Sequence, residues 1–258
     1  MKDLFRSVCM AFSMFSRLPA PRVEWKRENM RHMLGALPLV GAVLGLFYYL
    51  YFLAARALGF GALLFGAGLT AVGVLYTGGI HMDGFMDTCD ALACHGSIEK
   101  RHEILKDPRS GAFAVLYGAL YLIVLTALWA ETDRAAFLPV CFIPVFSRLA
   151  SALAGLLFPV YGAGTLKTFR DSSGKRAIIL PAVLLMLAEA GLLVLAPVYA
   201  GLFSLGTAVC LFVVYRMSQK KFGGMSGDLS GFLLSLTELV LLLLSVLFQK
   251  LIQTGVIL

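Results

Sequence analysis

Long stretches of uncharged residues dominate the pattern of hydrophobic and polar positions along the chain. A helix that crosses a bilayer needs about 20 mostly apolar residues, and stretches of that length occupy Met33–Ala55, Ala57–Ile80, Ser110–Ala130, Ala135–Phe158, Ala177–Tyr215 and Leu229–Gln249. The fifth stretch is long enough for two spans, with Pro197 near the turn between them. The pattern predicts an all-α fold, a polytopic integral membrane helix bundle of about seven transmembrane helices that forms a single membrane domain over residues 1–258.

Composition agrees with this pattern and excludes other classes of protein. The 258 residues are 59% apolar and 14% charged, whereas soluble domains are roughly 45–50% apolar and about 25% charged. Such hydrophobicity excludes a disordered chain. The five cysteines are scattered along a chain that is too long for a small secreted disulfide scaffold.

Lys and Arg residues are distributed unevenly between the two sides of the predicted spans. The N-terminal segment and the loops after the second, fourth and sixth helices hold 18 of them, whereas the opposite side holds 3. Cytoplasmic loops carry an excess of Lys and Arg, so we expect the N-terminus and these three loops to lie in the cytoplasm. Topology thereby accounts for the net charge of +7, and the expected partner is the lipid bilayer, with no nucleic acid. A homo-oligomer is compatible with this architecture.

Residues 1–32 are predicted to form a cytoplasmic or interfacial N-terminal segment. Its start contains Asp3 and Arg6 and lacks a clean apolar core followed by a small-residue cleavage site, so it does not match a signal peptide. Apolar side chains fall near one helical face, which favours an amphipathic helix at the membrane interface: Leu4, Phe5, Val8, Ala11, Phe12 and Phe15.

Acidic residues concentrate in a cytoplasmic segment, 81–110, that begins where the second span leaves the membrane. Asp83, Asp87 and Asp90 are spaced i, i+4 and i+7, which places their carboxylates on one helical face. Three such carboxylates repel one another unless a cation lies between them, and hard oxygen ligands suit Mg²⁺ or Mn²⁺. The alternative is a solvated acidic face. The apolar neighbours and the repulsion from anionic lipid argue against it, so we predict an active-site segment with a metal site.

Residues on either side of this cluster are candidates for substrate contacts. His81 adjoins hard oxygen ligands, so hydrogen bonding or a substrate contact fits it better than coordination. A short helix is expected over Ser97–Lys106, with Ser97 as its N-cap. Lys106, Asp107 and Arg109 follow, and they suit either a structural salt bridge or a phosphate-binding turn beside the N-terminus of the next helix.

A second constellation is the glycine-rich cytoplasmic loop 216–228, which continues into the last span. Gly223, Gly224 and Gly227 allow a backbone to approach a ligand closely, and Asp228 opens the following helix. The loop has two interpretations, a helix N-cap with flexible glycines or a second phosphate or metal contact. Its position on the same side of the membrane as the aspartates favours the second.

Three charged residues lie inside predicted spans, where charge is costly and must face the bundle interior or a polar cavity. Arg148 and Glu238 are near the cytoplasmic ends of their helices. They either reach the site there or form a buried ion pair. Glu189 lies farther from that side, and no role is predicted for it.

These motifs resemble two families. Asp83-Gly84 with the aspartates after it partly resembles the CDP-alcohol phosphotransferases, but Asp87-x₂-Asp90 replaces their later Asp-x₃-Asp. The chain more closely resembles the adenosylcobinamide-GDP ribazoletransferase (cobalamin synthase) family. The matching segments, in order along nearly the whole chain, are FSRLPAP (15–21), LPLVGAVLG (37–45), GGIHMDGFMDTCDAL (78–92), EILKDPRSGAFA (103–114) and GGMSGDLSG (223–231). Ala91 and Ala114 depart from positions where that family favours glycine.

The resemblance implies a reaction and a set of roles. The 3′-hydroxyl of α-ribazole, or of its 5′-phosphate, attacks the corrinoid-linked phosphorus of adenosylcobinamide-GDP, and GMP leaves. Mg²⁺ is the implied cofactor, with Asp83, Asp87, Asp90 and Asp228 as metal-binding and catalytic residues. The implied substrate contacts are His81, Lys106, Asp107, Arg109, Gly223, Gly224 and Gly227. The general base among the carboxylates stays open. The rival hypotheses are a CDP-alcohol phosphotransferase-like lipid enzyme and, less favoured, a transporter, which would show broken helices and a midplane site.

Overall fold

The computed structural model describes residues 2–256, and within that range it is helical with no strand. Six helical segments are long and apolar enough to cross a membrane, or seven when the bent pair α4–α5 counts as one span. The prediction of an all-α membrane bundle with about seven spans is confirmed. The spanning elements are α3 (Leu37–Ala57), α4 (Ala62–Thr77), α7 (Ala112–Glu131), α8 (Phe137–Val140) with α9 (Ile143–Leu157), η1 (Lys175–Ile178) with α11 (Ile179–Leu195), α12 (Pro197–Met217) with η2 (Ser218–Phe222), and α13 (Gly227–Gln253).

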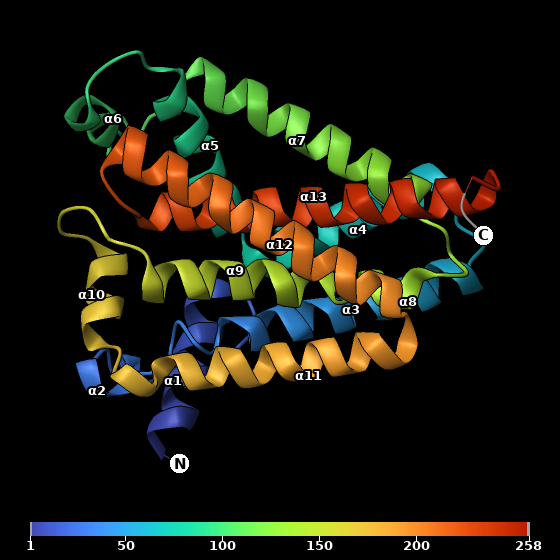
Figure 1. Ribbon diagram of the computed structural model, residues 1–258, viewed down its shortest axis with the longest axis horizontal. Helices are drawn as coiled ribbons and strands as arrows, with labels where there is room; N and C mark the ends of the chain where they lie inside the picture. Colours follow the sequence, from blue (N-terminus) through green and yellow to red (C-terminus); the bar gives the residue numbers. More distant parts are fainter. Residues whose placement is uncertain (1, 257–258) are drawn as a thin grey trace.

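The long helices run side by side along the longest axis of the molecule (Figure 1). Most of the shorter helices gather at the end of the bundle that carries the N-terminus, whereas the short α8 and the C-terminus lie at the other end. We call the first end the N-terminal end. Its helices are α1 (Lys2–Phe15), α2 (Arg27–Met30), α5 (Ile80–Ala93), α6 (Ile98–Ile104) and α10 (Thr165–Ser172).

The second span is shorter than the predicted stretch, because α4 ends at Thr77 rather than at Ile80. Gly78 and Gly79 follow with φ angles of +64° and +82°, a left-handed conformation that glycine adopts without steric cost. The chain bends by 95° there and continues as α5. The paired glycines thus turn the acidic helix out of the direction of the spans.

Prolines mark breaks between other helices. The predicted span 135–158 is divided into α8 and α9, and Pro144 occupies the first turn of α9, where its missing N–H costs no hydrogen bond. The predicted turn near Pro197 is confirmed, since α11 ends at Leu195 and Pro197 begins α12.

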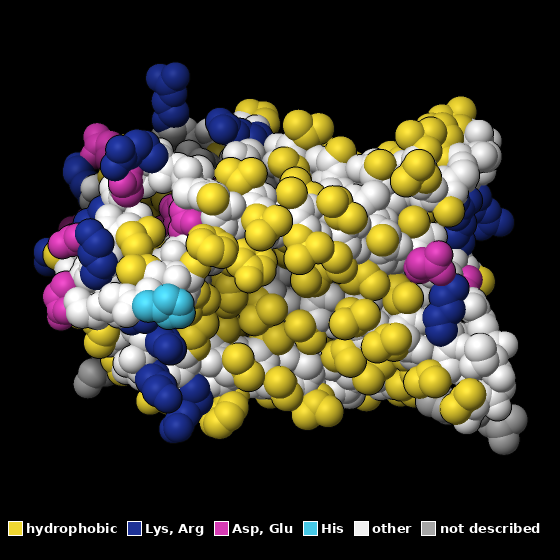
Figure 2. Space-filling view, turned by 90° about the horizontal axis from the view of Figure 1, so that it is seen from above, with side chains coloured by type: hydrophobic (Ala, Val, Ile, Leu, Met, Phe, Trp, Pro, Cys, Tyr) yellow, Lys and Arg dark blue, Asp and Glu magenta, His cyan; other side chains and the backbone are white. Residues whose placement is uncertain are grey.

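The surface separates apolar side chains from charged side chains, as the sequence pattern does. Hydrophobic side chains cover the middle of the molecule, and Lys, Arg, Asp, Glu and His side chains crowd the N-terminal end (Figure 2). Helix α1 leaves Phe5 63% exposed and Leu4 40% exposed, and it packs Met10 and Ala11 into the core. Exposed apolar residues at its start suit contact with a membrane interface.

Arg148 and Glu238 form an ion pair between α9 and α13. Arg148 is 1% exposed and also donates to Ser147, which in turn hydrogen-bonds Glu238. Of the two alternatives left open by the sequence, the structure shows the buried ion pair. Glu189 accepts a hydrogen bond from Ser204 on the neighbouring α12.

Candidate active site

Small residues bring α5 and α13 into close contact at the N-terminal end. A Cβ atom on Gly84 would lie 2.8 Å from the backbone oxygen of Asp228, and one on Gly231 would lie 3.0 Å from the oxygen of His81. Any larger side chain would push the helices apart. This contact sets the aspartates of α5 beside the first turn of α13, which carries Asp228.

The carboxylates of this region carry negative charge, and none of them is paired with a cation among the described side chains. Asp83, Asp87 and Asp90 share helix α5, as their spacing predicts. Burial, reinforced by the negative charges of Asp83, Asp228 and Asp90, raises the pKa of Asp87 to about 6. Among the side chains that the structure describes, no Lys, Arg or His forms a salt bridge with any of the four. We call Asp83, Asp87, Asp90 and Asp228 the carboxylate cluster.

Asp90 has a structural task within this cluster. Its carboxylate accepts hydrogen bonds from the N–H groups of Gly111 (2.6 Å) and Ala114 (3.1 Å) at the start of α7. A side chain on Gly111 would overlap the Asp90 carboxylate. Asp90 therefore caps α7 and fixes it against α5, through N–H groups that no residue within α7 could satisfy.

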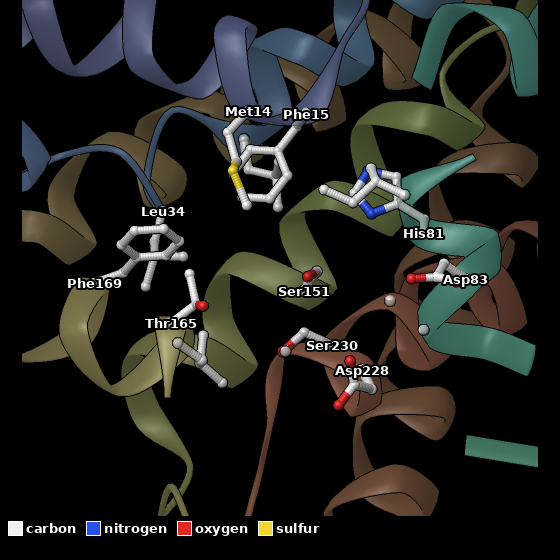
Figure 3. A pocket seen from close by; sticks show the side chains of 16 residues that line it. Met14, Phe15, Leu34, His81, Asp83, Ser151, Thr165, Phe169, Asp228 and Ser230 are labelled. Carbon is white, nitrogen blue, oxygen red and sulfur yellow. The ribbon is translucent and has the colours of Figure 1, made fainter. Parts of the chain in front are cut away.

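Two cavities meet at Asp228. The α1 cavity, of about 190 Å³, lies between α1, α5, α9, α10 and α13, and its lining includes His81 and Asp83 (Figure 3). The α6 cavity, of about 250 Å³, lies between the end of α6, the segment 160–167 and the start of α13. The residues that line both are Thr165, Leu166, Gly227 and Asp228. Asp228 is thus the carboxylate that a ligand in either cavity would meet.

The α6 cavity suits an anionic group. Lys106 and Lys167 contribute positive charge to its lining. Helix α10 begins at Thr165 without a side-chain cap, so the free N–H groups of its first turn belong to this cavity. His102 stacks on Tyr161 with ring centroids 3.9 Å apart, and its Nε2–H donates to the oxygen of Phe222 over 2.8 Å. This stack holds the cavity wall in place.

The α1 cavity is polar at one end and apolar at the other. Asp83, Asp228 and Ser230 lie toward one side of it, and the rings of Phe15 and Phe169 lie away from them (Figure 3). His81 also lines it and is 8% exposed, and it stacks on Phe15 with a centroid distance of 5.8 Å. The Nε2 atom of His81 has no hydrogen-bond partner among the described residues.

Other predicted site residues lie in different environments. Lys106 lines the α6 cavity, and α6 has Ser97 as its N-cap, as predicted. Asp107 and Arg109 pair with each other at 2.8 Å on an exposed turn, which is the salt-bridge alternative. They line an open hollow beside Asp90 rather than either cavity.

The glycine-rich loop is divided between two roles. The N–H groups of Gly223 and Gly224 donate to the oxygen of Ser218, and neither glycine lines the two cavities. A Cβ on Gly224 would lie 2.8 Å from the nitrogen of Tyr161, so this glycine allows the loop to pack on the segment 159–161. Gly227 does line both cavities. Ser226, not Asp228, is the N-cap of α13, because its hydroxyl accepts from the N–H of Leu229.

The carboxylate cluster has the donor chemistry of a magnesium site. Among residues 2–256, no three His, Cys, Asp or Glu side chains converge closely enough to enclose a metal on their own. Mg²⁺ is usually held by one or two carboxylates together with waters and substrate phosphates, and a cluster with uncompensated charge suits that mode. One or two of Asp83, Asp87 and Asp228 would hold it together with waters and phosphate oxygens, since both oxygens of Asp90 already accept backbone hydrogen bonds.

Several residues of the two cavities carried no signal in the sequence. His102 resembled an ordinary helical histidine, yet it lines the α6 cavity and is buried. Thr165, Lys167 and Phe169 lie in a loop and short helix without an acidic motif. The glycines at 162 and 164, close to Lys167 in a predicted cytoplasmic loop, are a weak signal that could have drawn attention to this segment.

The fold and the site define a class, a polytopic membrane protein with a carboxylate cluster and two cavities at one end of its bundle. A model of the cobalamin-5-phosphate synthase family matches residues 7–246. The chain belongs to this family, and the resemblance noted in its sequence is confirmed.

Curated relatives cover almost the whole chain. The adenosylcobinamide-GDP ribazoletransferase of Lachnoclostridium phytofermentans is 34% identical over 236 residues, or 91% of this chain and 90% of the relative. The protein of the same name from Syntrophobacter fumaroxidans is 33% identical over 90% of this chain and 94% of its own. The one from Clostridium perfringens is 31% identical over 95% and 98%. No solved structure matches the chain.

Proposed function

We propose that this protein is a transferase that joins α-ribazole, or its 5′-phosphate, to adenosylcobinamide-GDP with release of GMP. The relatives named for this reaction cover the chain nearly end to end. The observation that carries the proposal is Asp228, a member of the carboxylate cluster that lines both cavities. A reaction between two bound substrates needs such a meeting point.

The residues divide the transfer as follows. The 3′-hydroxyl oxygen of the ribazole forms a bond to the corrinoid-linked phosphorus, the phosphoanhydride bond breaks, and GMP leaves. Asp228 lies where the hydroxyl must be held, and its carboxylate takes the proton. Lys106, Lys167 and the first turn of α10 bind the diphosphate in the α6 cavity.

Mg²⁺ is the proposed cofactor, and when bound it stabilises negative charge on the phosphoryl oxygens. Asp83 and Asp87 are the favoured ligands, and Asp228, also predicted as a ligand, serves in this proposal as the base. Asp90, also predicted as a ligand, acts in this proposal by fixing α7 against α5. The α1 and α6 cavities are not lined by the other predicted contacts, Asp107, Arg109, Gly223 and Gly224, so this proposal gives them a supporting role.

The site belongs on the cytoplasmic side of a prokaryotic inner membrane. Lys and Arg residues crowd the N-terminal end of the bundle, where the cavities lie (Figure 2). The positive-inside rule assigns that end to the cytoplasm, where a nucleotide-activated substrate and Mg²⁺ are available.

A turnover assay on the detergent-purified protein tests this function. Adenosylcobinamide-GDP, α-ribazole and Mg²⁺ are expected to yield a cobamide and GMP in equal amounts by mass spectrometry, and EDTA should abolish both. Turnover of a CDP-linked lipid instead would support a lipid phosphotransferase. Folded protein that turns over neither donor would exclude transfer chemistry. The transporter hypothesis would then be favoured.

A further inference from the structure

The apolar end of the α1 cavity has no part in phosphoryl transfer as described so far. Its walls come from α1, from the turn before α3 and from α10, through Phe15, Leu34 and Phe169. Leu34 is 3% exposed and Phe169 is 5% exposed, so these side chains are fixed by packing rather than free in solvent. A preformed apolar wall of this kind is typical of a site for a flat, uncharged group.

The size of the cavity selects among the parts of the two substrates. Its volume of about 190 Å³ is below the roughly 300–1,000 Å³ of pockets that hold whole drug-sized ligands. A corrin macrocycle is excluded, and the charged diphosphate is better served by the lysines of the α6 cavity. A single fused aromatic ring system has the size and polarity that this cavity can accept.

The polarity of the cavity gives that group an orientation. Phe15, Leu34 and Phe169 lie on one side, and Asp83, Asp228 and Ser230 lie on the other, with Ser151 and Thr165 between them (Figure 3). Ribazole is a riboside of an apolar bicyclic base. With the base against the aromatic rings, its ribose extends to the carboxylates, where the attacking hydroxyl is required.

His81 supplies the polar contact along this path. It is more than nine-tenths buried, it lines the cavity, and its Nε2 has no partner among the described residues. A buried polar atom without a partner is costly, and a ribose hydroxyl would satisfy it.

We propose that the α1 cavity is the subsite for the aromatic base of the ribazole, and that Phe15, Phe169 and the space beside Ser151 determine which base is accepted. This inference rests on the proposed function. It adds that the two substrates occupy separate cavities and reach each other where these cavities meet, beside Asp228.

A pair of variants on one helix tests the aromatic wall. Phe15→Ala removes a ring that lines the cavity, whereas Phe5→Ala removes a ring from the exposed start of α1. We expect Phe15→Ala to raise the KM for α-ribazole about tenfold, as loss of an aromatic contact does, and to leave the KM for adenosylcobinamide-GDP within about twofold. Phe5→Ala should change neither.

Filling the cavity gives an independent test that does not depend on a stacking contact. Ser151 is 6% exposed and lines the cavity from α9, so Ser151→Leu places extra volume where the base would lie. The variant should discriminate against α-ribazole and retain more activity with the benzimidazole riboside, which lacks the two methyl groups. The ratio of kcat/KM values for the two ribosides should shift by about tenfold or more toward the smaller one.

The outcomes separate the two proposals. If the wild type turns over and both Phe15→Ala and Ser151→Leu change only the KM for adenosylcobinamide-GDP, or change neither KM, the base subsite is elsewhere and the transferase function stands. If the well-folded wild type forms no GMP, the proposed function fails and the subsite fails with it.

Discussion

Two groups of charged side chains in this protein differ in how their charge is compensated. Arg148 and Glu238 lie between α9 and α13 and neutralise each other inside the bundle. The carboxylate cluster at the N-terminal end has four negative charges and no cation paired with any of them in the described chain. A buried pair can serve the fold alone, because it is complete.

The uncompensated cluster is not explained by stability. Burial and, after it, repulsion from the neighbouring carboxylates disfavour the charged form of Asp87, as its raised pKa shows, and a fold alone would not require such a group. Clusters of perturbed titratable groups in a cleft are typical of functional sites. The comparison separates charge that is paired within the bundle from charge for which we propose a cation and a phosphorylated substrate as partners.

The largest expected effect is on catalysis. Asp87→Asn should abolish turnover, a loss of more than about ten-thousandfold or roughly 5 kcal/mol, because a ligand of the required cation is removed. Thermal unfolding in detergent should occur at the same or a higher temperature, since repulsion is reduced. Glu103→Gln, at an exposed carboxylate on the same end, is the matched control and should retain full turnover. A fully active Asp87→Asn enzyme would reject the site.

The buried pair should show the opposite behaviour. Glu238→Gln leaves the Arg148 charge without its partner in the bundle and should destabilise the fold by about 3–5 kcal/mol, measured as a drop in the unfolding temperature. The double variant Arg148→Met/Glu238→Leu should recover most of this loss. If Glu238→Gln instead unfolds like the wild type and lacks turnover, the pair belongs to the site.

Asp90 lies between these two cases and should affect stability moderately. Asp90→Ala removes the cap that binds the N–H groups of Gly111 and Ala114, a change that typically costs about 1–2 kcal/mol. Asp90→Asn keeps one acceptor oxygen, so this variant should be more stable and more active than Asp90→Ala. An Asp90→Asn enzyme as inactive as Asp87→Asn would make Asp90 a metal ligand after all.

The exposed pair Asp107–Arg109 should matter least to the fold. Its guanidinium is 86% exposed, and surface ion pairs contribute little. Arg109→Ala should leave the unfolding temperature unchanged and raise the KM for adenosylcobinamide-GDP by no more than about threefold. A much larger rise in that KM would show that the turn itself contacts the diphosphate.

Features that depend on local sequence could be predicted, and features that depend on distant contacts could not. The spacing of Asp83, Asp87 and Asp90 predicted their common helix, and the start of α6 at Ile98 followed from its capping residue, Ser97. The 95° bend at Gly78–Gly79 did not follow from hydropathy, because the apolar run continues through it.

The contact partners of the site residues could not be predicted from the sequence either. Asp90 binds the start of α7, and His102 stacks on Tyr161 from a loop about 60 residues away. Phe169 reaches the α1 cavity only because α10 folds back across the N-terminal end. Such contacts arise from the packing of the whole bundle, so no sequence motif predicts them.

Binding of Mn²⁺, a spectroscopic substitute for Mg²⁺, tests the central claim most directly. Electron paramagnetic resonance titrations of purified wild type, Asp87→Asn and Glu103→Gln would measure bound and free ion in the presence of adenosylcobinamide-GDP. The account predicts a bound ion in the wild type and in Glu103→Gln, and a large loss of affinity in Asp87→Asn. Equal binding by all three proteins, or by none of them, would contradict the claim that the carboxylate cluster holds a divalent cation.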